Sequence, residues 1–228
     1  MKDRPDAIVR SAQAAYLDRL LPRRDELLLE MESYAATEEI PISDPEVALM
    51  LQILVQATGA RRVLEVGSAI GYGTICLARG GVETRVIGLE MDPARIEKAR
   101  SYAARAALED RVEFLEGDAL ELMREVEAPF DLVYLDSAKK DYRRLLDFGL
   151  QLLRVGGLVV IDNLLWKGQV AEPPEDVNEE DEEAEILRGF NGYFAIHPQL
   201  DALVLPLADG LGIGVKKRAL VTDMGGPY

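Results

Sequence analysis

Short apolar runs alternate with amphipathic stretches through most of this chain. Short runs bounded by Gly or charged residues are typical of buried strands, whereas apolar positions repeating every three or four residues indicate helices. The runs predict strands at 62–66, 86–90, 112–115, 132–136 and 158–162. The stretches that follow predict helices from about residue 72 and at 93–107, 119–126, 142–153 and 179–195. Strict alternation of this kind predicts a parallel, doubly wound sheet with helices on both faces.

The two ends of the chain depart from this alternation. Residues 6–36 are expected to be helical with a break at Leu21-Pro22, and another helix is expected through residues 47–55. Near the other end, runs at 203–207 and 211–217 flank Ala208-Asp209-Gly210, a pattern typical of a β-hairpin. We therefore expect an α/β fold with a doubly wound, mostly parallel, seven-stranded sheet, a C-terminal antiparallel hairpin and extra N-terminal helices.

The length of 228 residues suits one α/β domain. We expect an N-terminal helical part at 1–58, the sheet with its helices at 59–218, and a tail at 219–228. No apolar run approaches the roughly 18 residues of a membrane helix, and the first residues lack the apolar core of a signal peptide. A single Cys agrees with a reducing compartment. The sequence thus predicts a cytoplasmic protein without a membrane partner.

Acidic residues outnumber basic ones by 41 to 26, which gives a formal net charge of −15. Nine of the acids lie at residues 172–185, where they suit a solvated loop and the start of a helix. The balance argues against a broad polyanion-binding surface. A smaller basic patch stays open, because several basic residues lie near the fourth and fifth predicted strands: Lys139, Lys140, Arg143, Arg144 and Lys167.

Polar side chains end two of the predicted strands. The run from Leu132 ends in Asp136, and the run from Leu158 ends in Asp162 and Asn163. Because the carboxyl ends of parallel strands meet at one edge of a sheet, these three side chains are expected to converge. Their hard oxygen donors suit Mg²⁺, or another divalent cation such as Mn²⁺ or Ca²⁺. The simpler interpretation is that strand-end acids cap the helices that follow them.

The turn after the first predicted strand contains three Gly residues within residues 67–73. The dinucleotide fingerprint needs Gly at its first, third and sixth positions. Counted from Gly67, the third position is Ala69 and the sixth is Tyr72, so NAD is disfavoured. Glu90 follows Gly67 by 23 residues, where a carboxylate commonly binds a ribose diol. Glu65, an acid in an otherwise apolar strand end, suits a ligand with positive charge. S-adenosylmethionine offers the ribose, an ammonium and a sulfonium.

These motifs together resemble the metal-dependent S-adenosylmethionine O-methyltransferases, the family that includes the catechol and caffeoyl-CoA O-methyltransferases. Residues 63–67 with Gly71-Tyr72 are similar to the family's cofactor loop, and residues 117–120 to its adenine-side loop. Asp136 with Lys139 and Tyr142 resembles the metal and base motif, and Asp162-Asn163 the metal pair. The resemblance extends over nearly the whole chain, from residues 40–43 to the hairpin at 210–213.

The resemblance implies a Rossmann-like methyltransferase fold, a homodimer and a set of site residues. In that set Asp136, Asp162 and Asn163 would hold the metal, and Lys139 with Asp136 would be catalytic, Lys139 taking or stabilising the acceptor's proton. The expected cofactor contacts are Ser43, Glu65, Gly67, Gly71, Tyr72, Gly73, Glu90, Asp118, Ala119 and Asp136. Two positions depart from many bacterial members, which have Asp at the place of Ala138 and Ser at the place of Gly73.

The acceptor is left open by the sequence. Within the family the nearest resemblance is to the bacterial tRNA 5-hydroxyuridine methyltransferases, carried by residues 68–72, 136–139, 167–172 and 197–198. A catechol-like small molecule and 5-hydroxyuridine in tRNA both present a hydroxyl beside a second oxygen. Trp166 is expected either to cover the edge of the core or to form a lid over the substrate. The alternatives are a non-catalytic S-adenosylmethionine-binding protein and a nicotinamide oxidoreductase.

Overall fold

The computed structural model describes residues 11–171 and 179–218. The start of the expected N-terminal helix, the part of the acid-rich stretch before residue 179 and the tail at 219–228 lie outside the described residues. The strands are β1 (Arg62–Val66), β2 (Arg85–Glu90), β3 (Val112–Glu116), β4 (Phe130–Leu135), β5 (Leu153–Ile161), β6 (Leu200–Leu205) and β7 (Leu211–Lys216). The α-helices are α1 (Ser11–Leu20), α2 (Glu26–Thr37), α3 (Pro45–Thr58), α4 (Tyr72–Arg79), α5 (Pro93–Arg105), α6 (Ala119–Glu125), α7 (Tyr142–Leu152) and α8 (Glu179–Ala195). Two 3₁₀ turns, η1 (Lys139–Asp141) and η2 (Trp166–Gly168), follow β4 and β5.

The sheet has seven strands in the order β3-β2-β1-β4-β5-β7-β6. The strands β1 to β5 pair in parallel, whereas β7 runs antiparallel to both β5 and β6. The predicted fold class is therefore confirmed, including the C-terminal hairpin. Chain order reverses between β1 and β4, which in doubly wound sheets opens a crevice for ligands at the carboxyl ends of the strands.

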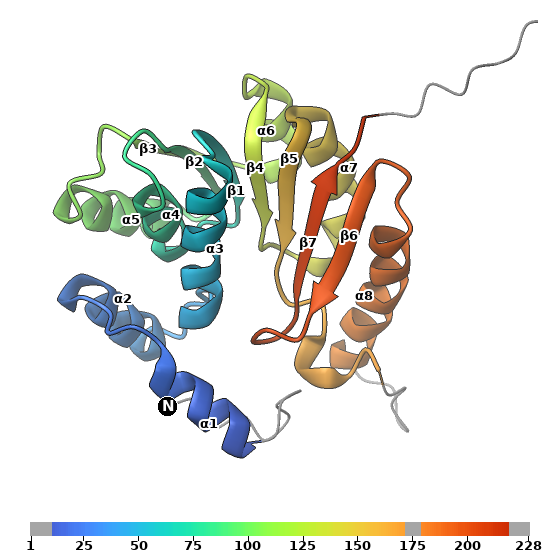
Figure 1. Cartoon of the computed structure of the whole chain (residues 1–228). Coiled ribbons are helices and arrows are strands. Elements are labelled where there is room, and N and C mark those ends of the chain that lie inside the picture. Colours follow the sequence, from blue (N-terminus) through green and yellow to red (C-terminus); the bar gives the residue numbers. More distant parts are fainter. Residues whose placement is uncertain (1–10, 172–178, 219–228) are drawn as a thin grey trace, which may run out of the picture.

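Helices cover the sheet on both faces (Figure 1). Along β4, Leu132 and Tyr134 point into a cluster formed with α2, α3 and α4, while Val133 and Leu135 point into a second cluster formed with α6, α7 and α8. All four side chains are fully buried. A strand buried on both faces has no polar side to expose, which explains the continuous apolar runs in the sequence.

Strand β5 begins earlier than the sequence predicts. The expected start was residue 158, because Gly156 and Gly157 interrupt the apolar run. In the structure β5 begins at Leu153, which pairs with Phe130 at the start of β4 across a register shift. Both side chains are buried, so tertiary packing extends the strands beyond the local pattern. No helix within the described residues has the length and apolar character needed to cross a membrane.

Candidate active site

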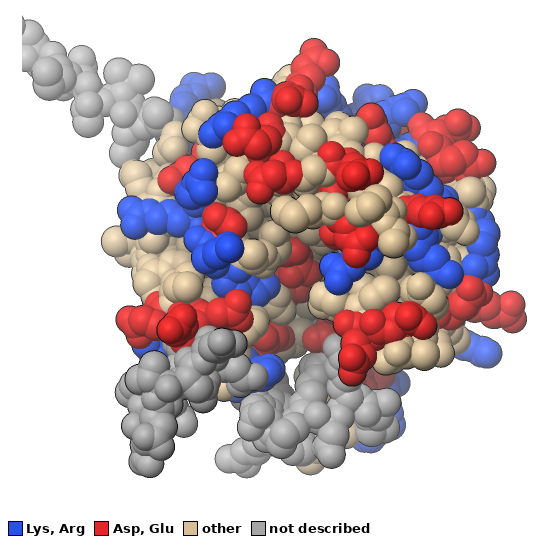
Figure 2. Space-filling model, turned by 180° about the vertical axis from the view of Figure 1, so that it is seen from behind, with Lys and Arg blue, Asp and Glu red and all other residues tan. Residues whose placement is uncertain are grey.

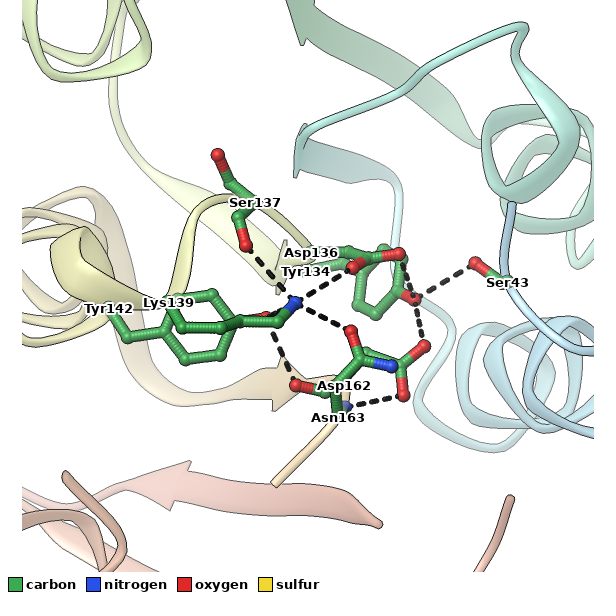
Figure 3. Close-up of polar contacts among 8 residues, drawn as sticks. All are labelled: Ser43, Tyr134, Asp136, Ser137, Lys139, Tyr142, Asp162 and Asn163. Atoms are coloured by element: carbon green, nitrogen blue, oxygen red, sulfur yellow. Dashed lines mark hydrogen bonds and ion pairs between the residues drawn. The ribbon is translucent and has the colours of Figure 1, made fainter. Parts of the chain in front are cut away.

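The two strand-end acids lie side by side at the carboxyl edge of the sheet (Figure 3). Asp136 follows β4, and its backbone N–H donates to the carbonyl oxygen of Val66 at 2.9 Å. Asp162 follows β5, and its N–H donates to the carbonyl oxygen of Leu135 at 3.0 Å. These bonds continue the parallel pairing by one residue, which places both carboxylates over the same edge. The predicted convergence is thereby confirmed.

Asn163 and Lys139 complete this group. Asn163 has a φ of 61°, a left-handed conformation that Asn adopts more readily than most residues. The Lys139 ammonium donates to the side-chain oxygen of Asn163 at 2.6 Å, to the Tyr142 hydroxyl at 2.8 Å and to the Ser137 carbonyl at 3.1 Å. Its Nζ also lies 3.7 Å from Asp136 Oδ1. A positive charge thus already lies among the oxygen atoms that the sequence predicts to bind a cation.

Tyr134 is a site residue that the sequence analysis missed. Its hydroxyl lies 3.0 Å from Asp162 Oδ2, 3.5 Å from Asp136 Oδ2 and 3.0 Å from the Ser43 hydroxyl. The pattern of the strand showed only a buried aromatic side chain. The signal that was available is the phenol itself, because a tyrosine hydroxyl inside a core nearly always has a hydrogen-bond partner.

Burial shapes the electrostatics of the two carboxylates. Desolvation and, as a smaller cause, the neighbouring Asp136 charge together raise the pKa of Asp162 to about 7. Burial likewise raises the pKa of Asp136, while the Lys139 ammonium acts in the opposite direction. Two acids with too little nearby positive charge form an environment that favours a bound cation.

The donor set fits a divalent cation of the hard type. Within residues 11–171 and 179–218, no group of three or more His, Cys, Asp or Glu side chains is placed to hold a metal. A cation here would therefore depend on the carboxylates of Asp136 and Asp162 and on the carboxamide of Asn163. All three present oxygen, the donor that Mg²⁺, Mn²⁺ and Ca²⁺ prefer, and water or substrate would supply the other positions.

The glycine turn after β1 packs against the backbone of Asp136. Gly67 has a φ of 90°, and a Cβ at this position would overlap the carbonyl oxygen of Asp136. Gly71 also has a positive φ, 83°, and is the N-cap residue just before α4. Only glycine permits this conformation and this close approach together. The turn therefore brings the expected cofactor loop against the expected metal site.

Glu90 holds the cofactor loop in place. Its Oε2 accepts the N–H of Ala69 at 2.9 Å, and its Oε1 accepts the N–H groups of Met91 and Asp92 at 2.9 and 3.0 Å. A carboxylate has about four acceptor positions, so one remains for a ligand hydroxyl. The structure adds a scaffold role to the ribose contact that the sequence predicts for Glu90.

The Glu65 carboxylate occupies the space next to Gly73. Glu65 is buried, and its carboxylate accepts a hydrogen bond from the Thr74 hydroxyl. A Cβ at Gly73 would overlap Glu65 Oε1, so a serine at residue 73 would require the carboxylate to move. Burial raises the pKa of Glu65 to about 8. The departure at Gly73 noted in the sequence thus makes room for the Glu65 carboxylate.

The remaining predicted cofactor residues have structural partners. Asp118 caps α6 by accepting the N–H groups of Leu120 and Glu121, and Ala119 is the first residue of that helix. Gly117 donates its N–H to the carbonyl of Glu90 at 3.0 Å, which brings the adenine-side loop beside Glu90. The Tyr72 hydroxyl donates to Glu32 of α2 at 2.6 Å. Its side chain therefore joins α2 to the cofactor loop, a contact that the sequence did not indicate.

Three residues of the expected basic patch have partners within the protein, whereas Lys140 is exposed. Lys139 is buried, the Arg143 guanidinium lies 4.3 Å from the centre of the Tyr193 ring, and Arg144 lies 3.7 Å from Asp141. On the face in Figure 2, acidic and basic side chains are interspersed. A continuous basic field is not visible on that face.

Comparison with known proteins finds O-methyltransferases among the relatives of this chain. The O-methyltransferase family model matches residues 23–217. Tricin synthase 1 from Oryza sativa subsp. japonica is 31% identical over 208 residues, covering 85% of this chain and 82% of that protein. A catechol O-methyltransferase from Mycobacterium tuberculosis is 33% identical over 195 residues, covering 84% and 86%. The crystal structure of an O-methyltransferase from Bacillus cereus in complex with SAH is 32% identical, with a TM-score of 0.79 and coverage of 90% of this chain and 97% of that chain.

Proposed function

Because the chain belongs to the O-methyltransferase family, we propose that it transfers the methyl group of S-adenosylmethionine to a hydroxyl with a second oxygen beside it, using a divalent cation. The observation that carries this proposal is the convergence of Asp136, Asp162 and Asn163 next to the Gly67 turn. Family membership supports S-adenosylmethionine as the methyl donor and sets aside the nicotinamide oxidoreductase.

The residues at the carboxyl edge of the sheet have different roles in this reaction. A bound divalent cation would supply Lewis acidity, which lowers the pKa of a phenolic hydroxyl from its usual value near 10 and favours acceptors with two adjacent oxygens. As an ammonium, Lys139 is placed to stabilise with its Nζ the negative charge that forms on that oxygen; in its neutral form it would take the proton of the hydroxyl. The glycine turn and Glu65 would orient the cofactor so that the sulfur–methyl bond breaks as the oxygen–methyl bond forms, and this alignment contributes much of the acceleration.

The acceptor we favour is a small catechol-like molecule. Trp166 follows the metal pair in a left-handed conformation, and its ring centre lies 5.8 Å from Lys139 Nζ. An indole beside the reacting groups offers a flat apolar wall that suits an aromatic ring. The names of the relatives from rice and Mycobacterium tuberculosis, a tricin synthase and a catechol O-methyltransferase, agree with this choice.

The second candidate acceptor is 5-hydroxyuridine in tRNA. It is favoured by the local motif resemblance at residues 136–139 and 167–172. A tRNA substrate needs basic groups for its phosphates, and Lys139, Arg143 and Arg144 already have partners within the protein. This engagement makes the small molecule the stronger proposal.

A methylation assay separates these acceptors. Labelled S-adenosylmethionine with Mg²⁺ would be incubated with a catechol, with a matched phenol that has a single hydroxyl, and with hydroxyuridine-containing tRNA at low and high salt. We expect rapid methylation of the catechol that responds weakly to salt, and little reaction of the phenol. Methylation of tRNA alone, falling steeply as salt rises, would replace the small-molecule acceptor by RNA. Full catechol turnover after dialysis against a chelator would contradict the proposed dependence on a divalent cation.

A further inference from the structure

In the buried part of β4, from Leu132 to Leu135, the Tyr134 hydroxyl is the only polar side-chain group. Its side chain is fully buried and points toward the cluster formed with α2, α3 and α4. A phenylalanine would fill the same space without the cost of burying a hydroxyl, which is considerable unless the hydroxyl is hydrogen-bonded. The partners of this hydroxyl therefore indicate what the tyrosine contributes.

The Tyr134 hydroxyl joins three elements at the site (Figure 3). It has one proton, and the nearer carboxylate oxygen is Asp162 Oδ2 at 3.0 Å, compared with 3.5 Å for Asp136 Oδ2. Carboxylate oxygens only accept, so Tyr134 donates to Asp162 and accepts from the Ser43 hydroxyl at 3.0 Å. Ser43, in the segment between α2 and α3, is thereby linked through Tyr134 to the end of β5.

Both oxygens of the Asp162 carboxylate accept hydrogen bonds in this arrangement. Oδ2 accepts from Tyr134, and Oδ1 accepts the N–H of Asn163 at 2.7 Å. The same hydroxyl lies between the facing oxygens of Asp162 and Asp136, where it separates two negative charges. Both carboxylates are consequently fixed in rotation, with Asp136 Oδ1 toward Lys139.

We propose that Tyr134 is a positioning residue that orients the carboxylates of Asp162 and Asp136 for a divalent cation. This inference rests on the proposed metal-dependent function. Groups that hydrogen-bond to metal ligands commonly contribute about 10- to 100-fold to metal affinity. Tyr134 touches neither substrate nor cofactor in this assignment, and it acts through the two acids.

The test compares two deletions of a buried tyrosine hydroxyl. Tyr134→Phe removes the bridge, whereas Tyr102→Phe is the matched control, because the buried Tyr102 hydroxyl has no hydrogen-bond partner among the described residues. Calorimetry would measure the dissociation constants of Mn²⁺ and of S-adenosylhomocysteine for each variant. We expect Tyr134→Phe to weaken Mn²⁺ binding by about 10-fold or more with S-adenosylhomocysteine binding unchanged, and Tyr102→Phe to change neither.

A second variant tests the direction of the chain of hydrogen bonds. Ser43→Ala should weaken Mn²⁺ binding several-fold in the wild-type background and have no further effect in the Tyr134→Phe background, since its influence passes through that hydroxyl.

Three outcomes would overturn the inference. Equal Mn²⁺ affinity in wild type and Tyr134→Phe would show that the hydroxyl does not position the acids. Loss of S-adenosylhomocysteine binding together with Mn²⁺ binding would show that it maintains the whole pocket instead. Absence of Mn²⁺ binding by the wild type would contradict the proposed function itself, and this result is distinguishable from the other two.

Discussion

At the scale of single residues, Lys139 joins the expected base to the expected metal site. It is 8% exposed, and the oxygen atoms around its Nζ come from Ser137, Asp136, Tyr142 and Asn163. A lysine held this firmly cannot sample solvent, so its position relative to the acceptor is set before substrate binds. Such preorganisation suits a group that handles a proton in the reaction.

Lys139→Met should therefore remove catalysis while preserving cofactor binding. We expect kcat to fall by about 10²- to 10⁴-fold, the usual contribution of a positioned acid or base. The dissociation constant of S-adenosylhomocysteine should stay near its wild-type value. Steady-state kinetics and calorimetry check both quantities, with Lys140→Met as the control from the exposed neighbouring residue. A kcat within a few-fold of wild type would remove Lys139 from the reaction.

Glu65 makes stability depend on pH in a defined direction. Its pKa is about 8 in the folded protein and 4.5 without the protein environment, so the folded state retains a proton that the unfolded state releases between these values. The stability that Glu65 contributes is present below pH 4.5 and is lost as the pH rises toward 8. Burial is the main cause of the raised pKa; the hydrogen bond from Thr74 lowers it, and the charges of Asp136 and Glu90 are smaller causes that raise it.

Glu65→Gln should flatten this pH dependence in the protein without cofactor. One proton corresponds to a slope of about 1.4 kcal/mol per pH unit in the free energy of unfolding between pH 5 and 8. Urea unfolding across that range would reveal it as the difference between wild type and variant, because the titration of Asp162 is common to both. Parallel stability curves for the two proteins would show that Glu65 is ionised in the folded state.

At the scale of elements, the cofactor loop depends on one carboxylate at the end of β2. Glu90→Ala should weaken S-adenosylmethionine binding by roughly 1.5 to 3 kcal/mol, through loss of a charged hydrogen bond and release of the loop at Ala69. The control is Glu116→Ala, since Glu116 pairs with Glu90 in the parallel register but is exposed. Calorimetry would compare the two variants. An unchanged dissociation constant for Glu90→Ala would mean that the cofactor does not contact this edge as assigned.

On the level of the whole molecule, helix α1 lies apart from the sheet (Figure 1), and three of its large apolar side chains are exposed. Tyr16, Leu17 and Leu20 are 55%, 53% and 60% exposed. The sequence predicts a homodimer, and apolar residues grouped on one helix suit contact with a second copy. Leu17→Glu with Leu20→Glu should shift the mass measured by light scattering from dimer to monomer. A monomeric wild type would contradict the homodimer.

The elements, their alternation and the chemistry at the strand ends could be predicted from the amino-acid sequence. Buried parallel strands produce continuous apolar runs, and an acid after such a run must lie at the carboxyl edge, so Asp136 and Asp162 were predictable from local pattern alone. The failed dinucleotide spacing and the position of Glu90 likewise depend only on short segments of chain. The O-methyltransferase family was accessible for the same reason, because its motifs are local.

How these segments meet could be learned only from the folded protein. Tyr134 belongs to the site because β4, β5 and the Ser43 segment are packed together, and residues more than 90 positions apart leave no signature in one another's local sequence. Gly73 is explained by the Glu65 carboxylate across the turn, and the extended start of β5 by its pairing with Phe130. Contacts between elements depend on packing and burial, which are properties of the folded chain and not of any single stretch of it.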